Sequence, residues 1–326
     1  MSRSALPDDE PREECGVLAV ATQGGDAARL GFFGLYALQH RGQEAAGIAV
    51  SDGRAVRIHK DQGLVSQVFK PGTLDPLVGS LAIGHTRYST TGSNSERNVQ
   101  PYVVETMHGP LALAHNGNLT NADRLRQKLL ERGAGLQSSS DSEVLALMLA
   151  AAEGDSWEDR LARTMPEWEG AFCLVILSGT KVVVARDPWG FRPLSVGKLP
   201  TGGYVAASET GALQTVGCTD IREVKPGEIV VLQSGLARSY QAMEPKTNQA
   251  RCTFEHIYFS RPDATWDGLS VHQARQNLGE ELAREHPAEA DVVIPVPDSS
   301  MPAAIGFANV SGIPYNEGFV KNRYIG

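Results

Sequence analysis

Short apolar segments bounded by glycine or polar turns dominate the first 240 residues, and they limit the folds open to this chain. Each segment has the length and boundaries of a β-strand. Helical patterns interrupt the series instead of alternating with every strand, so we expect helices layered on sheets rather than a regular strand–helix–strand winding. The expected strands are residues 15–22, 45–51, 55–60, 81–86, 111–116, 171–178, 181–186, 204–209 and 228–233.

Two segments within this region have the pattern of helices, residues 118–133 and 138–154. In the first, Asn121 is predicted to cap the N-terminus and Gly133 to end the helix. The second is predicted to be capped near Ser140 to Ser142.

The character of the chain changes after a polar stretch at residues 241–252, which indicates a domain boundary. Residues 270–286 predict an amphipathic helix, 290–300 an apolar strand that runs into a proline turn, and 301–312 a further helix. Strand, loop and helix in that order are typical of the start of a doubly wound parallel sheet. Only one such unit is present, so we expect an incomplete second domain.

Composition excludes some classes of function. The chain has 326 residues, enough for two domains or one large one, and a formal net charge of −8, which argues against a general nucleic-acid-binding surface. No stretch approaches the roughly 20 apolar residues of a membrane span, and no secretory signal precedes the first strand. The four cysteines are scattered without a CxxC pair, which favours a reducing, cytoplasmic setting. A special cysteine would then be catalytic or metal-binding.

Cys15 stands at the head of the first expected strand, and several polar loops could accompany it. Cys15 alone could be only a small buried residue. The companions also have simpler explanations as surface ion-pair partners, a hairpin turn or a helix cap. These companions are Arg41, Arg87, Asn116, Gly117 and Asp141.

Together these residues supply what amide hydrolysis needs. A thiol can act as the nucleophile, and an asparagine amide beside a glycine N–H can stabilise an oxyanion. An arginine suits the α-carboxylate of an amino-acid substrate, and a carboxylate suits its ammonium group. The base is less clear, since His40, His85 and His115 are candidates by adjacency only.

The 14 residues before Cys15 suggest another base. Removing them would create an α-amine on the nucleophile's own residue, with an ordinary pKa of roughly 7.7–8.0. We therefore predict that residues 1–14 are a propeptide and that the Glu14–Cys15 bond is the processing site.

Seven motifs follow one another along the chain: CGVLAV, LQHRGQEAAGIAVSDG, GHTRYSTTG, LAHNGNLTN, SDSE, RDPWGFRPL and FEHIYFSRPD. In order and spacing they resemble the glutamine phosphoribosylpyrophosphate amidotransferase (amidophosphoribosyltransferase) family in its propeptide-bearing form. The resemblance implies a four-layer αββα N-terminal-nucleophile glutaminase sandwich over residues 15–245, an α+β fold. The start of an α/β phosphoribosyltransferase domain would follow over residues 246–326.

The resemblance implies a role for each candidate residue. Cys15 would form a glutamyl thioester and release ammonia, with Asn116 and Gly117 as the oxyanion hole. Ammonia would pass internally to the second domain and displace pyrophosphate from phosphoribosyl pyrophosphate, with Mg²⁺, giving phosphoribosylamine in the first step of purine synthesis. The glutamine-binding residues would be Arg87 and Thr90 for the carboxylate, Asp141 for the ammonium and Arg41 for closing the site.

For the second domain the resemblance is partial. Ser299 would lie next to Mg²⁺ and pyrophosphate, and Lys321 and Arg323 could meet phosphate. The paired aspartates and threonine-rich loop of the family should come later than Gly326, so we expect a truncated chain, with a natural short form as the alternative. Family members are usually homotetramers, and this is the expected assembly.

Cys252 lies in a stretch resembling one that supplies a [4Fe–4S] ligand in propeptide-bearing members. The alternative for Cys252 is an inert strand cysteine, and Cys173 and Cys218 are predicted to belong to the core. Two other functions stay open. One is a catalytically silent regulatory or assembly partner, although no catalytic position has been lost. The other is a free-standing glutaminase acting without phosphoribosyl pyrophosphate.

Overall fold

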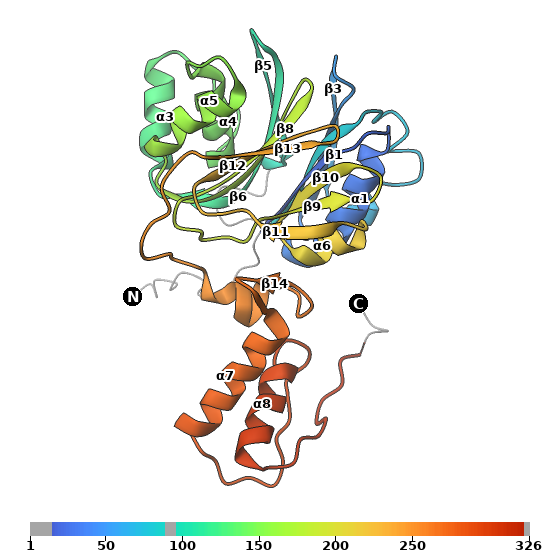
Figure 1. Ribbon diagram of the computed structural model, residues 1–326, viewed down its shortest axis with the longest axis vertical. Helices are drawn as coiled ribbons and strands as arrows, with labels where there is room; N and C mark the ends of the chain where they lie inside the picture. Colours follow the sequence, from blue (N-terminus) through green and yellow to red (C-terminus); the bar gives the residue numbers. More distant parts are fainter. Residues whose placement is uncertain (1–14, 89–95, 323–326) are drawn as a thin grey trace, which may run out of the picture.

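The computed structural model describes residues 15–88 and 96–322, and Figure 1 shows a layered upper body followed by a smaller helical part. The predicted propeptide (1–14), Thr90 and Arg323 lie outside the described residues. None of the described helices combines the length and hydrophobicity that crossing a bilayer requires.

The upper body contains two antiparallel sheets that lie face to face (Figure 1). The first has the order β11-β9-β10-β1-β4-β2-β3 and the second has the order β13-β12-β8-β7-β6-β5. The strands of the first sheet are β1 (Gly16–Ala21), β2 (Ala45–Ser51), β3 (Val56–Gln62), β4 (Leu81–Arg87), β9 (Ser195–Leu199), β10 (Gly203–Ala207) and β11 (Thr219–Glu223). Those of the second are β5 (Tyr102–Thr106), β6 (Gly109–Leu119), β7 (Gly170–Ser178), β8 (Lys181–Arg186), β12 (Glu228–Gln233) and β13 (Leu236–Gln241).

Helices cover the outer face of each sheet. Against the first sheet lie α1 (Ala27–Ala37), α2 (Val65–Val68) and α6 (Thr210–Thr215). Against the second lie α3 (Ala122–Glu131), α4 (Asp141–Ala151) and α5 (Trp157–Thr164). A third core, which includes Val17, Ile83 and Val175, fills the space between the sheets. The four-layer αββα sandwich is confirmed.

Helix termini in the second covering layer follow the sequence signals in part. Ser140 caps α4, its hydroxyl accepting a hydrogen bond from the Ser142 N–H at 3.2 Å. Gly133 follows α3 with a φ of +79°. Asn121 precedes α3, but the predicted side-chain cap is wrong, because its amide pairs with the main chain of Glu167 and Glu169.

The lower part begins with a π-helical turn, η4 (Glu255–Phe259), and a small hairpin of β14 (Thr265–Trp266) and β15 (Leu269–Ser270). Two helices, α7 (Val271–Glu285) and α8 (Met301–Ser311), then pack closely together (Figure 1). Their approach requires glycine, because a Cβ at Gly279 would lie only 1.9 Å from the Ala303 carbonyl oxygen. Both predicted helices are confirmed.

The strand predicted at residues 290–300 is wrong. Within the described residues, this segment makes only an isolated parallel bridge, between Val293 and Tyr315. A strand is stabilised by a ladder of hydrogen bonds to its neighbours, and one bridge does not supply a ladder. Ile294 and Val296 remain 42% and 69% exposed, so the apolar pattern that suggested a buried strand is not buried here.

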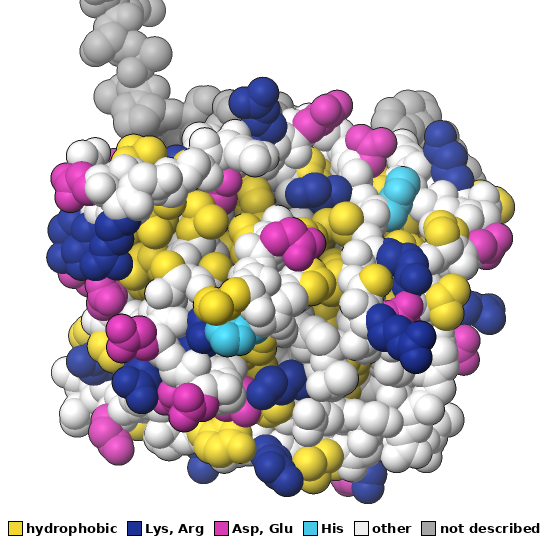
Figure 2. Space-filling model, turned by 90° about the horizontal axis from the view of Figure 1, so that it is seen from above, with side chains coloured by type: hydrophobic (Ala, Val, Ile, Leu, Met, Phe, Trp, Pro, Cys, Tyr) yellow, Lys and Arg dark blue, Asp and Glu magenta, His cyan; other side chains and the backbone are white. Residues whose placement is uncertain are grey.

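Figure 2 shows the end of the sandwich that lies opposite α7 and α8. Acidic and basic side chains are interspersed over this face, with hydrophobic side chains between them. Side chains of both charges are therefore mixed across this end of the molecule.

Candidate active site

Cys15 directly precedes β1, the central strand of the first sheet. Its strand pairs with β4 in a register that places Gly16 opposite Thr86. The Cys15 Sγ lies 3.3 Å from the carbonyl oxygen of Tyr88, and the Tyr88 N–H points to the same sulfur at 3.5 Å. The residue is 9% exposed, so the thiol is mostly shielded from water.

Asn116 approaches the same region from the second sheet. His85 of β4 contacts the carbonyl oxygen of His115 on β6 at 3.2 Å, which joins the two sheets. Cys15 lies two residues before Val17, the strand partner of His85, and Asn116 directly follows His115. The two candidate residues therefore lie close to one contact between the sheets.

The Asn116 side chain is fully buried, and neither its nitrogen nor its oxygen has a hydrogen-bond partner among the described residues. An unsatisfied buried polar group costs about 1–3 kcal/mol. Such groups are rare in folded proteins and call for a functional explanation. The alternative that Asn116 and Gly117 form a hairpin turn is wrong, because both lie inside β6 opposite Cys173 and Phe172.

Gly117 has a backbone that only glycine adopts readily, with φ +150°. A Cβ here would lie 2.1 Å from the Ala171 carbonyl oxygen and 2.8 Å from Nε2 of His115. Glycine therefore allows β6 and β7 to approach each other beside Asn116.

Replacing Gly117 by alanine is expected to lower the free energy of unfolding by about 1–3 kcal/mol, because the backbone becomes strained and the new methyl group meets a carbonyl. Urea unfolding measures this change. Gly135→Ala is the matched control, since a Cβ at Gly135 meets nothing within 4 Å. Equal stability of the two variants would contradict the described backbone.

Asp141 begins α4 and faces the end of β6. One carboxylate oxygen accepts a hydrogen bond from the Leu119 N–H at 2.9 Å, and the other lies 3.6 Å from Nδ1 of His115. Burial alone would raise the pKa of Asp141, but His115 and the hydrogen bonds from Leu119 and Ser142 lower it below its usual range. Asp141 therefore presents a buried negative charge.

Arg87 is buried as the last residue of β4, opposite Ala45 of β2, at the same end of the sheet as Cys15. Burial, together with the charge of Arg87, lowers the pKa of His85 to about 3. An imidazole with so low a pKa is a weak proton acceptor near neutral pH. His115 is engaged by Ser142 at 3.2 Å and by the Ala171 carbonyl oxygen at 3.3 Å.

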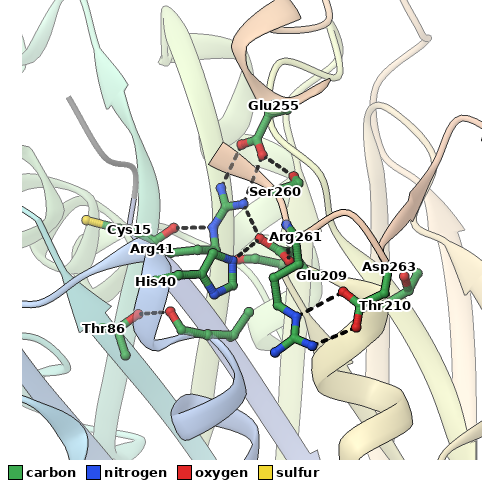
Figure 3. A network of polar contacts seen from close by, with 12 residues as sticks. Cys15, His40, Arg41, Thr86, Glu209, Thr210, Glu255, Ser260, Arg261 and Asp263 are labelled. Carbon is green, nitrogen blue, oxygen red and sulfur yellow. Dashed lines mark hydrogen bonds and ion pairs between the residues drawn. The ribbon is translucent and has the colours of Figure 1, made fainter. Parts of the chain in front are cut away.

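Arg41 occupies the centre of a buried polar network (Figure 3). Its Nε donates to the carbonyl oxygen of Cys15 at 3.1 Å. The other guanidinium nitrogens contact Glu209 at 2.8 Å and Glu255 at 2.6 and 2.9 Å. The alternative of a surface ion pair is wrong, because Arg41 is 1% exposed. The guanidinium therefore fixes the main chain of the candidate nucleophile.

The two carboxylates of this network were not found by sequence reasoning. They lie 168 and 214 residues from Arg41, and no local pattern connects residues that far apart. Burial would raise the pKa of Glu209, but His40 and Arg41 lower it to about 2. Glu255 belongs to η4, so the network also joins the sandwich to the segment that leads into α7.

A cavity of about 410 Å³ lies beside this network. It brings Ser299 and Lys321 to the same space as Arg41, together with Arg261 and Arg275. The full lining is His40, Arg41, Tyr258, Phe259, Ser260, Arg261, Pro262, Arg275, Pro297, Asp298, Ser299 and Lys321.

The residues present do not complete a metal or cluster site. Among residues 15–88 and 96–322, no three His, Cys, Asp or Glu side chains converge as metal ligands. Cys252 is half-buried before η4, and its N–H donates to the Phe191 carbonyl oxygen at 3.2 Å. We therefore assign no step of a reaction to Mg²⁺ or to a [4Fe–4S] cluster.

Comparison with known proteins relates this geometry to a family. Residues 85–215 match the model of a glutamine amidotransferase domain. Amidophosphoribosyltransferase from Methanothermobacter thermautotrophicus is 44% identical, over 98% of this chain and 68% of its own length. The chain belongs to the amidophosphoribosyltransferase family. The homologue from Synechococcus elongatus is 49% identical over 98% of this chain.

A solved amidophosphoribosyltransferase also has this fold. Glutamine phosphoribosylpyrophosphate amidotransferase from Bacillus subtilis, in complex with ADP and GMP, superposes with a TM-score of 0.89 at 45% identity, covering 96% of this chain and 67% of that one. The chain spans about 65% of the Synechococcus homologue's length. It thus corresponds to part of the known amidophosphoribosyltransferases.

Proposed function

We propose that this chain hydrolyses glutamine through Cys15 and supplies the ammonia for transfer to phosphoribosyl pyrophosphate. The glutaminase proposal rests on the Asn116 amide. This amide is buried and has no hydrogen-bond partner among the described residues. A polar side chain kept unsatisfied in a protein interior suits a group that bonds only to a reacting substrate.

The reaction follows from these groups. After removal of residues 1–14, the α-amine of Cys15 takes the thiol proton, and the thiolate attacks the side-chain amide carbon of glutamine. The amide oxygen becomes an oxyanion, which the Asn116 amide and the Gly117 N–H stabilise. The tetrahedral intermediate collapses with return of the proton to the leaving nitrogen, giving ammonia and a glutamyl thioester. Water then attacks the thioester and releases glutamate.

Other residues position the substrate and the nucleophile. Arg87 holds the α-carboxylate of glutamine, and Asp141 holds its α-ammonium. Both side chains are buried, and each has the charge opposite to the group it would bind. Thr90 is assigned to the same carboxylate from the sequence alone. Arg41 acts through the backbone of Cys15, because its Nε binds the Cys15 carbonyl oxygen. Its other two nitrogens bind the carboxylates of Glu209 and Glu255.

Replacing Asn116 by leucine tests the proposal. We expect kcat for glutamine hydrolysis to fall about 10²–10³-fold with little change in KM, because an oxyanion donor acts mainly in the transition state. The melting temperature should stay the same or rise, because leucine has a similar volume and removes two unsatisfied groups. Steady-state kinetics and calorimetry measure both. Unchanged kcat would favour a structural role and remove the support for catalysis.

Phosphoribosyl transfer is the second half of the proposal. It is supported by the names of the homologues and by the cationic lining of the cavity that contains Ser299. Arg261, Arg275 and Lys321 line the same cavity and suit a phosphorylated ligand. The roles of Ser299 toward Mg²⁺ and of Cys252 toward a cluster stay predictions, as do the homotetramer and the cytoplasmic location.

A further inference from the structure

Gln100 occupies the place where the ladder between β5 and β6 stops. The two strands pair up to Tyr102 and Leu113, and the same register carried further would set Gln100 opposite His115. Pro101 has no N–H to donate, so a regular ladder cannot continue through it. The Gln100 side chain bonds the His115 backbone instead. Its oxygen accepts from the His115 N–H at 2.7 Å, and its nitrogen donates to the His115 carbonyl oxygen at 3.5 Å.

The first sheet holds Gln100 in this position. The Lys60 ammonium, from β3, donates to the carbonyl oxygens on either side of Gln100, those of Val99 at 2.5 Å and Pro101 at 3.0 Å. Gly47 of β2 lies opposite Lys60, and a Cβ there would lie 2.2 Å from the Gln100 carbonyl oxygen. The Gln100 backbone is therefore fixed between the two sheets.

This arrangement acts on the residue directly before Asn116. Gln100 is 6% exposed, and its amide engages both polar atoms of the His115 main chain. We propose that Gln100, held by Lys60, is a positioning residue that fixes the oxyanion-stabilising segment Asn116–Gly117. The proposal rests on the glutaminase function proposed above. Misplacement of a catalytic group by about 1 Å can reduce a rate about 10²-fold.

Gln100→Met in the full-length protein removes both contacts to His115 and keeps the side-chain length. We expect kcat for glutamine hydrolysis to fall about 10- to 100-fold with KM changed less than about twofold. The rate of Cys15 alkylation by iodoacetamide should stay unchanged, because that reaction needs no oxyanion hole. Lys60→Met should reproduce the effect and Lys60→Arg should restore most of the activity. Gln127→Met, on the exposed face of α3, is the matched control.

Hydrogen exchange at the His115 amide provides a readout that does not depend on activity. We expect faster exchange in Gln100→Met, since the bond from this amide to the Gln100 oxygen is lost, and no change in Gln127→Met. Unchanged exchange, a rise in KM alone, or a parallel fall in the alkylation rate would each overturn the positioning role. Wild-type protein that releases no glutamate while the exchange difference persists would instead remove the proposed function and leave the structural contact standing.

Discussion

Replacing Cys15 by alanine is expected to reduce glutamine hydrolysis at least about 10⁴-fold, as loss of the nucleophile does in other enzymes with covalent intermediates. Alanine keeps the Cys15 backbone, so the Arg41 contact to its carbonyl oxygen can persist. Stability should change little, because only the sulfur of one small side chain is lost. Release of glutamate from glutamine, followed by a coupled assay, measures the effect.

Cys218→Ala is the matched control for this experiment. Cys218 is also buried, at 7% exposed, but it packs in the core of the first sheet with α1 and α6. It should keep full hydrolysis of glutamine. Full ammonia release by Cys15→Ala would contradict every role assigned around Cys15, including that of the Asn116 amide.

Replacing Arg41 by methionine is expected to lower the free energy of unfolding by about 3–5 kcal/mol at pH 7. The change leaves Glu209 and Glu255 buried, at 3% and 0% exposed, without their main cationic partner. Urea unfolding followed by circular dichroism measures this difference. Glutamine hydrolysis should fall as well, since the Cys15 main chain loses its contact with the guanidinium.

The loss of stability should depend on pH. In the wild type, Glu209 has a pKa of about 2 against an ordinary value of 4.5, so its ionised form stabilises the fold above pH 4.5 and this contribution is lost as pH falls toward 2. Without Arg41, burial should raise the pKa of Glu255 above its ordinary value, because Arg41 is the main group that lowers it. As pH falls from 7 toward 4.5, protonation would remove the unpaired buried charge from the variant. The difference in unfolding free energy between wild type and variant should therefore be smaller at pH 5 than at pH 7.

Arg163→Met is the control for the Arg41 variant. Arg163 also pairs with a carboxylate, that of Asp159, but the pair lies on the exposed surface of α5. Exposed pairs contribute little to stability, so no measurable change is expected. Equal unfolding free energies of the two variants would show that the buried network does not hold η4 against the sandwich. A loss of unfolding free energy in the Arg41 variant that does not change with pH would show the same.

Local patterns in the sequence predicted many of the strands and helices of the sandwich, and the family resemblance predicted its four layers. Apolar runs such as residues 171–178 and 181–186 form β7 and β8, and the capping signal near residues 140–142 marks the start of α4. The strands that were missed are shorter or more exposed: β11, for example, has the exposed sequence Thr219–Glu223. α1 was missed because its residues Ala27–Ala37 are apolar with little periodicity.

Features that depend on distant residues could not be predicted. Glu209 and Glu255 meet Arg41 only through the fold, and the bond from Gln100 to His115 replaces a backbone ladder that no pattern announces. The strand expected at residues 290–300 failed for a related reason. Its apolar pattern was real, but a strand also needs neighbours with which to pair, and here it makes one bridge.

The central claim is that Cys15, with its own α-amine, is the nucleophile that accepts the glutamyl group. Mass spectrometry of peptides from acid-quenched enzyme and glutamine tests it directly. The claim predicts an N-terminal peptide that begins at Cys15 and carries one glutamyl group as a thioester. An active protein whose chain still begins at Met1, or a glutamyl group on another residue, would contradict it.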